Sequence, residues 1–306
     1  MGGRLSTGVI VSAPKLASYY SEKQDDGRYY KNPFTGDTAA SVTTILKGEN
    51  KDNLIQWAAD RVAWFFATNP SFALTRTAEA TFQGARFKHN DFRDERAEIG
   101  TAVHNWIEAD LDGGWQYPEL WDEEVIECVA QWKLFLEVHN MEALHVETTV
   151  WSEENGYAGT LDFYGYIDGE LWLLDLKTSK NLWDGHEYQL AALEQAEYGL
   201  VECDEDHPDA SPKFVYTDWE TKEKFTTYWR KITLEKPVKR GFLHIRPTYT
   251  DPQTGDITPA FWDLVEVDAE DIPALHNVFL GYAQAHSGKA EVKALRKSRE
   301  PDKVNW

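Results

Sequence analysis

The sequence predicts an α/β fold in which a helical N-terminal region precedes a mixed central sheet flanked by helices. The first observation is a change of period, because apolar residues recur at helical spacing over residues 53–139 and alternate with polar ones from Val146. The second is a pair of turn signals, Asn155-Gly156 and Asp168-Gly169, which separate three alternating segments. The third is that 42% of the 306 residues are hydrophobic, which is enough to bury a substantial core.

The N-terminal half is predicted to be helical after a polar arm over residues 1–40. Turn-forming pairs such as Asp26-Gly27 and Asn32-Pro33 favour a short hairpin within the arm. Residues 41–140 are expected to form a helical region packed on the core. Its four helices cover about 54–68, 71–87, 91–112 and 121–139, and Gly113-Gly114 ends the third.

Residues 141–287 are predicted to form the sheet and the helices that cover it. The first three strands are expected over 146–151, 160–167 and 170–177, followed by a helix over about 186–200. Later strands are expected over 213–216, 225–229 and 241–246, before a long helix over 271–286. The polar segment 288–306 is interpreted as a loosely held tail.

Composition and charge narrow the class of protein. The chain has 52 Asp and Glu against 31 Lys and Arg, a net charge of −21, which argues against a nucleic-acid partner because phosphate binding usually needs a basic surface. The two cysteines, Cys128 and Cys203, are too few for an iron–sulfur cluster or a disulfide framework. The N-terminus lacks the apolar segment of a signal peptide, and no run of about 20 apolar residues could span a membrane. A cytoplasmic chain with no membrane partner is therefore expected.

One predicted hairpin gathers charged side chains on an otherwise apolar sheet. If Asp168-Gly169 is a two-residue turn, its register places Asp162 directly opposite Asp175. Two carboxylates at that spacing repel each other unless a proton or a cation lies between them. Lys177, two residues after Asp175, projects from the same face. Oxygen ligands of this kind suit Mg²⁺ or Mn²⁺, while a surface hairpin with a salt-bridged Asp-x-Lys is the alternative interpretation.

Four segments together resemble a known nuclease superfamily. Gly159-Thr160-Leu161-Asp162 on one strand and Asp175-Leu176-Lys177 on the next are similar to the core motif of the PD-(D/E)XK nucleases. Gly100-Thr101-Ala102-Val103-His104 and Tyr188-Gln189-Leu190 resemble a helical histidine motif and a glutamine motif of its RecB-like and phage-type exonuclease branch. The resemblance covers residues 40–200 well and is weak beyond residue 210.

Two departures place the chain nearer to the compact phage-type members of this branch. The related CRISPR-associated RecB-like exonucleases usually carry four cysteines for an iron–sulfur cluster, and two cysteines cannot supply them. The glutamine motif of the family often has a tyrosine four residues later, where this chain has Leu193. Neither departure affects the expected metal ligands.

The resemblance implies a restriction-endonuclease-like core and a set of site residues. One or two Mg²⁺ or Mn²⁺ ions would be held by His104, Asp162, Asp175 and the backbone carbonyl of Leu176. Catalytic roles are implied for Asp162, Asp175, Lys177 and Gln189, with Lys177 serving the attacking water. Auxiliary roles are expected for Glu147, Tyr188 and Glu108, and nucleic-acid contacts for Lys180, Lys239 and Arg240. A structural or surface role is the alternative for His104, Glu147, Glu108 and Gln189.

The activity implied is metal-dependent hydrolysis of phosphodiester bonds in DNA by an exonuclease, phage-encoded and acting in recombination, replication or repair. Linear duplex or single-stranded DNA would be the substrate, and a recombination or single-strand-binding protein is an expected partner. Two alternatives stay open. One is a catalytically silent nuclease-fold module that binds DNA or a protein, and the other is a metal-dependent hydrolase of small phosphate compounds.

The negative charge is unevenly distributed along the sequence. Residues 90–127 hold 12 acidic and 2 basic residues, a net −10, whereas residues 213–246 carry a net +5 and residues 289–303 a net +3. Bound cations would reverse the local field at a metal site. DNA affinity is therefore expected to be weak without metal and to depend on the two basic segments.

Overall fold

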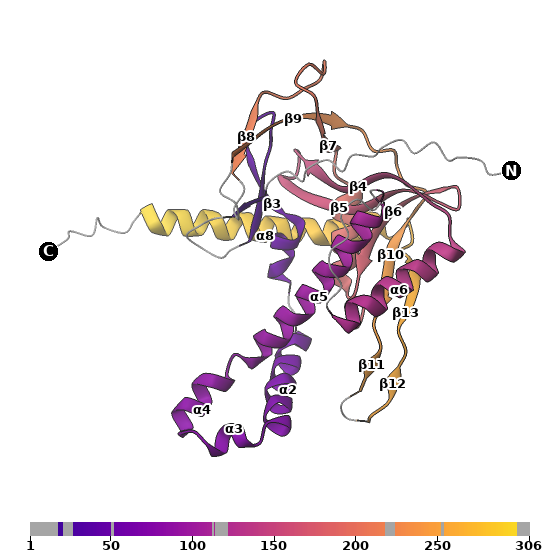
Figure 1. The fold of residues 1–306 in the computed structure, drawn as a ribbon. Helices are drawn as coiled ribbons and strands as arrows, with labels where there is room; N and C mark the ends of the chain where they lie inside the picture. Colours follow the sequence, from indigo (N-terminus) through magenta and orange to yellow (C-terminus); the bar gives the residue numbers. More distant parts are fainter. Residues whose placement is uncertain are drawn as a thin grey trace.

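The computed structural model describes residues 18–20, 27–49, 52–111, 113, 122–217, 224–251 and 254–298. In this part of the chain, helices cover both faces of a large mixed β-sheet, which confirms the predicted α/β class. Figure 1 shows the sheet at the centre, with α5 (Lys88–Leu111) and α6 (Glu123–Val138) on one side of it and the long α8 (Ile272–Ser298) on the other.

The main sheet holds eleven of the described strands. Its central run is β4 (Met141–Ser152), β5 (Tyr157–Ile167), β6 (Glu170–Lys177) and β10 (Lys239–Arg246), with β13 (Phe261–Glu266) beyond β10. On the other side of β4 lie β7 (Tyr198–Cys203), β9 (Lys224–Ile232) and β8 (Phe214–Thr217). Pairing is antiparallel except between β6 and β10 and between β3 (Thr38–Ser41) and β5. A separate hairpin joins β11 (Tyr249–Thr250) and β12 (Ile257–Thr258).

The hairpin between β5 and β6 has the register that the sequence predicts. Ile167 pairs with Glu170, and regular pairing continues as far as Phe163 with Leu174. Asp168 and Gly169 have φ angles of 52° and 86°, the left-handed conformations that a type I′ turn requires at both central positions. The two-residue turn is therefore confirmed.

A fork opens in the sheet where β5 changes partner along one edge. Tyr157 and Ala158 pair with β3, and pairing with β6 begins only at Phe163. Between these two ladders, within the described part of the chain, residues 159–162 have a neighbouring strand on the β4 side alone. The fork leaves an open edge at the level of Asp162.

The segment predicted to be an arm contributes strands to the sheet. β3 pairs with β2 (Arg28–Lys31), which in turn pairs with β1 (Ser18–Tyr20), and both pairings are antiparallel. β2 and β3 form the short hairpin that the turn signals predict. The three strands extend the sheet beyond the fork, so they are part of the sheet and not a separate arm. The remainder of that segment, residues 1–17 and 21–26, lies outside the described residues.

Apolar faces of the helices hold the three layers together. The predicted stripe of α5, formed by Ile99, Val103, Trp106 and Ile107, is buried with α6 against one face of β5, β6 and β10. On the other face lie α1 (Val42–Ile45), the short helix η1 (Leu46–Gly48), α7 (Asp184–Glu194) and the first half of α8. Each Å² of apolar surface that is buried stabilises the fold by roughly 25 cal/mol, so the packing of helices on both faces of the sheet is the main stabilising contribution.

Two predicted helix boundaries are wrong. The helix expected over 71–87 is split into α3 (Ser71–Leu74) and α4 (Ala78–Ala85), because the Thr77 side chain accepts a hydrogen bond from the Ala80 N–H and starts a new helix. The helix expected over 186–200 ends at Glu194, since residues 198–203 form β7 between β4 and β9. That short apolar run fits a helix or a buried strand equally well, and pairing with distant strands decides between them.

The C-terminal boundary is also corrected. α8 continues through Gly288 to Ser298, so the first part of the predicted tail is helical. One glycine costs a helix only about 1 kcal/mol, and the Lys, Ala, Leu and Arg residues that follow are good helix formers. Residues 299–306 lie outside the described part.

A helical lobe projects from the core. It consists of α2 (Asp52–Thr68), α3, α4 and the first residues of α5, up to Arg93 (Figure 1). Ala85 is the single buried residue among the described side chains of α2, α3 and α4, so this part of the predicted helical region does not pack on the core. Among the described helices, none is long and apolar enough to cross a bilayer.

Candidate metal centre

Three acidic residues lie side by side across three adjacent strands at the fork, one on each strand. The pairs Val146–Phe163 and Thr148–Leu161 place Glu147 of β4 opposite Asp162 of β5. The β5–β6 register places Asp175 of β6 on the other side of Asp162, one step beyond the last regular pair. The sequence-derived register therefore predicts the alignment of Asp162 with Asp175, although regular pairing stops just before it.

Where the regular hydrogen bonds between β5 and β6 stop, the backbone of Leu176 bonds to side chains instead. Its N–H donates a 2.7 Å hydrogen bond to Oδ2 of Asp162. Its carbonyl oxygen lies 3.1 Å from Nε2 of His104, and because a carbonyl can only accept, Nε2 carries the proton in this contact. One peptide segment thus orients both a carboxylate and an imidazole. The sequence assigned this carbonyl to a metal ion, whereas here it fixes the histidine.

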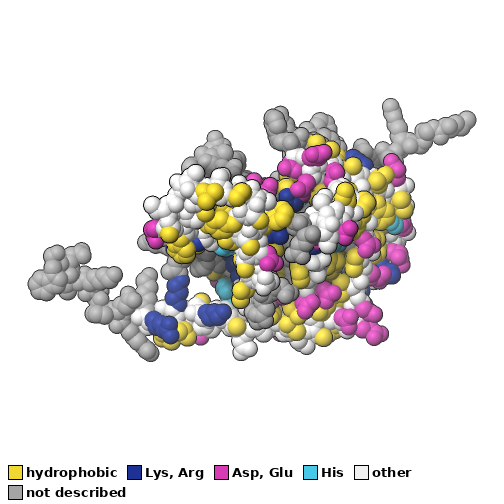
Figure 2. All heavy atoms as spheres, turned by 90° about the horizontal axis from the view of Figure 1, so that it is seen from below, with side chains coloured by type: hydrophobic (Ala, Val, Ile, Leu, Met, Phe, Trp, Pro, Cys, Tyr) yellow, Lys and Arg dark blue, Asp and Glu magenta, His cyan; other side chains and the backbone are white. Residues whose placement is uncertain are grey.

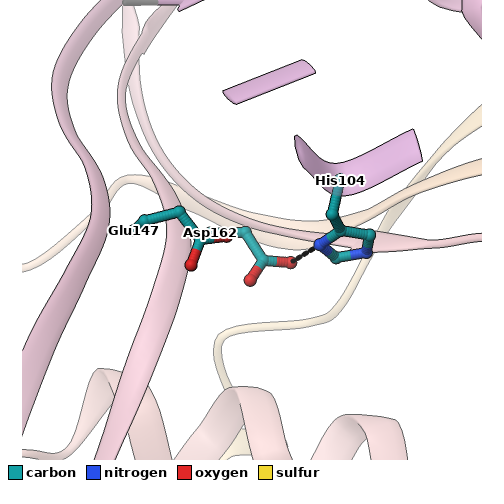
Figure 3. Close-up of side chains that lie close together, drawn as sticks. All are labelled: His104, Glu147 and Asp162. Carbon is teal, nitrogen blue, oxygen red and sulfur yellow. Dashed lines mark ion pairs between the residues drawn. The ribbon is translucent and has the colours of Figure 1, made fainter. Parts of the chain in front are cut away.

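His104 reaches the fork from α5, which passes close to the end of β6. A Cβ atom at Gly100, one turn earlier, would lie 3.1 Å from the Oγ1 atom of Thr178, the residue after Lys177. The glycine is therefore explained by the close approach of the strand end to the helix. This approach brings Nδ1 of His104 to 3.7 Å from Oδ2 of Asp162 (Figure 3).

The imidazole of His104 is held in its neutral form. Burial lowers its pKa below the ordinary value, and the positive charge of Lys177 lowers the pKa further, while Glu147 and Asp175 act in the opposite direction. With the proton on Nε2, the lone pair of Nδ1 faces Asp162. A neutral imidazole with its other nitrogen bonded to a backbone carbonyl is the usual state of a metal-binding histidine.

His104, Glu147 and Asp162 form a group whose candidate ligand atoms all lie within 4.8 Å of one another. Figure 3 shows the Asp162 side chain between the other two, each contributed by a different element. Glu147 has a left-handed backbone conformation, with φ 48°, which is strained for a side chain of this type. One nitrogen and two carboxylate donors converging in this way fit a hard or borderline divalent cation such as Mn²⁺ or Mg²⁺.

Asp175 lies outside this group and is paired differently. Its side chain is 1% exposed, forms an ion pair with Lys177, and accepts a 3.0 Å hydrogen bond from Nε2 of Gln189. The resemblance implies a catalytic role for Gln189, and here its amide positions the Asp175 carboxylate. In the structure Glu147, expected as an auxiliary residue, completes the candidate ligand group in place of Asp175.

The other two auxiliary residues are not members of this ligand group. Glu108 is half-buried one turn further along α5 and is not among the three converging residues. The ring of Tyr188 faces away to α8, where its centroid lies 6.1 Å from that of Tyr282. Leu193, at the position of the family's tyrosine, is buried in the core beside Gly159.

The predicted nucleic-acid contacts separate into three cases. Arg240 is 2% exposed, and its Nε donates a 2.9 Å hydrogen bond to Glu194 inside the protein, so its assignment as a DNA contact is wrong. Lys239 is ion-paired with Glu266 and lies level with Trp172, about 10 Å along β6 from Asp175. Lys180 is exposed just beyond the end of β6, where its Nζ lies 4.5 Å from the centre of the Tyr249 ring.

His244 is a buried residue of this region that sequence reasoning missed. It is the neighbour of Lys177 on β10, and its Nε2 donates a 2.7 Å hydrogen bond to the carbonyl of Ser179. This bond fixes the segment that follows Lys177. The sequence places His244 within a predicted strand, and no motif distinguishes it from a core residue.

No family model matches the chain, and no curated protein has a significant match with it. The geometry of the fork and the chemistry of its side chains are therefore the grounds for a functional assignment.

Proposed function

We propose that this protein is a metal-dependent deoxyribonuclease with a PD-(D/E)XK-type core, which hydrolyses phosphodiester bonds as an exonuclease in DNA recombination, replication or repair. The single observation that carries the proposal is the alignment of Glu147, Asp162 and Asp175 on three adjacent strands, with His104 and Lys177 beside them. A sheet that gathers three acids, an imidazole and a lysine at one open edge supports hydrolytic chemistry better than a purely structural role.

His104, Glu147 and Asp162 would hold the ion. A bound Mg²⁺ or Mn²⁺ would supply Lewis acidity at a phosphate oxygen and a lowered pKa for a coordinated water. The Leu176 backbone keeps two of these three ligands in place. Because the ligands are half-buried, they would limit the water around a phosphate bound at the fork.

Lys177 and Asp175 would act as a unit beside the ion. Gln189 and Lys177 hold the buried Asp175 carboxylate from two sides, and Asp175 in turn fixes the lysine ammonium. The ammonium would steer the attacking water and stabilise the charge that develops on the phosphate. His244 holds the backbone after Lys177 and so limits movement of this lysine.

Digestion of end-labelled DNA tests the proposal. Linear duplex, circular duplex and single-stranded substrates are incubated with Mg²⁺ or Mn²⁺, and an exonuclease should release label from linear molecules while sparing circles. Asp175→Asn and Lys177→Ala should each lower the rate by at least about 100-fold. Glu142→Gln is the matched control, since Glu142 is an exposed acid on the same strand as Glu147.

Three outcomes would count against the proposal. Cleavage that survives both substitutions would place the activity elsewhere. Absence of a divalent-ion site in a calorimetric titration would favour a catalytically silent module. Hydrolysis of small phosphate monoesters without attack on DNA would favour the small-phosphate hydrolase.

A further inference from the structure

The helical lobe carries an unusual surface for a protein of this charge. Phe82 and Phe87 are 56% and 54% exposed, and Leu74 is 85% exposed. In a protein with a substantial core, large apolar side chains grouped on one projecting element mark a site of interaction. The question is which class of partner these side chains fit.

The exposed rings of the lobe alternate with guanidinium groups. The Arg86 guanidinium carbon lies 4.3 Å from the centre of the Phe87 ring and 5.6 Å from that of Phe82. The Arg76 guanidinium carbon lies 4.1 Å from the centre of the Phe72 ring, which is half-buried and packs edge-on against Phe65. Flat rings with positive charges beside them offer both stacking surfaces for bases and charges for phosphates.

The charge of the lobe also differs from that of the chain. Residues 52–93 contain five Lys or Arg and four Asp or Glu, a net +1, whereas the whole chain carries −21. Figure 2 views the molecule from the side on which the lobe projects, and acidic side chains are concentrated on the half of this face away from the lobe. The lobe therefore repels an anionic chain less than the acidic half of this face does.

α5 connects the lobe to the candidate metal centre as one continuous helix. Lys88 and His104 are 16 positions apart on it, which corresponds to about 24 Å at 1.5 Å per residue. At the stacked spacing of about 3.4 Å this distance matches roughly seven nucleotides. A strand held on the lobe would thus lie within reach of the fork.

We propose that the surface formed by Phe72, Arg76, Phe82, Arg86 and Phe87 binds single-stranded DNA and presents it to the metal centre. The inference rests on the proposed nuclease function and specifies its substrate. Single strands are favoured over duplex because exposed rings stack on bases that are not already paired and stacked. A protein partner would fit the rings but would not need a guanidinium beside each.

Fluorescence anisotropy with a labelled oligothymidylate of about 16 nucleotides, the upper end of usual single-strand sites, tests this proposal. Binding is measured in EDTA, so that cleavage plays no part. Phe82→Ala with Phe87→Ala should weaken binding about 30-fold, and a blunt duplex of the same length should bind the variant and the wild type within about twofold. Arg86→Ala should lower the slope of log affinity against log salt by about 0.7.

Val138→Ala with Lys31→Ala is the matched control, because both side chains are exposed and lie outside the lobe and outside the two basic segments. Oligothymidylate affinity that is the same in the Phe82/Phe87 variant as in the wild type would overturn the inference, and a lobe that docks a protein would give that result. Asp175→Asn separates the two proposals. If the wild type cleaves DNA but the lobe variants bind normally, the lobe inference fails alone. If the wild type binds through the lobe but cleaves no more than Asp175→Asn, the nuclease proposal fails.

Discussion

Glu147→Gln should have opposite effects on stability with and without a divalent ion. Glu147 and Asp162 place carboxylate oxygens within 4.8 Å of each other, and the amide removes one of the two negative charges without changing the shape of the side chain. Without metal the variant should be more stable than the wild type, because a like-charge repulsion is relieved. With Mn²⁺ it should be less stable, because a ligand has been lost.

The size of the metal-free effect follows from the geometry. Two unit charges 4.8 Å apart interact by about 0.9 kcal/mol in water and about 3.5 kcal/mol at an effective dielectric constant of 20. Both groups are half-buried, so we expect a gain of about 1–3 kcal/mol. At about 2.1 cal/mol/K of unfolding entropy per residue, the chain of 306 residues would show a rise in Tm of about 2–5 °C.

Thermal unfolding followed by circular dichroism, in EDTA and in a Mn²⁺ series, measures both effects. Binding at 100 times Kd stabilises the wild type by about 2.7 kcal/mol, which corresponds to about 4 °C here, and most of this shift should be missing in the variant. Glu142→Gln should behave as the wild type in both buffers. A lower Tm for Glu147→Gln in EDTA, or a full Mn²⁺ shift in that variant, would refute the assignment of Glu147 as a ligand.

Three further predictions concern residues away from the ligands. Arg240→Ala should lower the free energy of unfolding by about 3–5 kcal/mol because a buried carboxylate loses its partner, whereas Lys239→Ala should leave the urea midpoint unchanged; equal losses would contradict the buried pair. Burial raises the pKa of Cys128 from an ordinary 9.0 to about 12, so the stability it contributes is complete below pH 9 and declines as pH rises toward 12. From pH 8 to pH 10.5, the free energy of unfolding measured in urea titrations should therefore fall by about 2 kcal/mol less for Cys128→Ser than for the wild type. An equal fall in both proteins would contradict this explanation. A Cβ at Gly165 would lie 2.3 Å from a backbone carbonyl of β4, so Gly165→Ala should cost about 1–3 kcal/mol, and an unchanged urea midpoint would show that the strands can separate.

Local signals predicted the β5–β6 hairpin but not the position of Glu147. The Asp168-Gly169 turn fixes its own register, since both residues accept a left-handed backbone. A two-residue turn at Asn155-Gly156 would have placed Thr149 opposite Asp162. The actual connection is four residues long, with Ser152 paired to Tyr157, and this brings Glu147 into line instead. A left-handed backbone at Glu147 and a register shift between Ala143 and His145 accompany this pairing, and no sequence pattern marks either.

Long-range packing explains the other differences. Counting charges treats Arg240 as part of a basic surface, but Glu194 of α7 pairs with it inside the protein. In the same way, helical periodicity predicts the helices of the lobe without indicating whether their apolar residues face the core. Contacts between elements distant in the sequence decide whether Arg240 is buried and which way the helices of the lobe face. These contacts cannot be inferred from a single sequence.

The turn at Asp168-Gly169 also limits how this protein can change in evolution. Asp175 follows Asp162 by 13 positions, which is an odd number. Any two residues paired across a two-residue turn are separated by an odd number of positions, because equal numbers of residues lie between each of them and the turn. Adding one residue to one arm would move Asp175 to the opposite face of the sheet, whereas adding one residue to each arm would keep the two acids aligned. Relatives with longer or shorter hairpins should therefore differ in this interval by steps of two. That parity offers a criterion for recognising distant homologues when overall sequence similarity has disappeared.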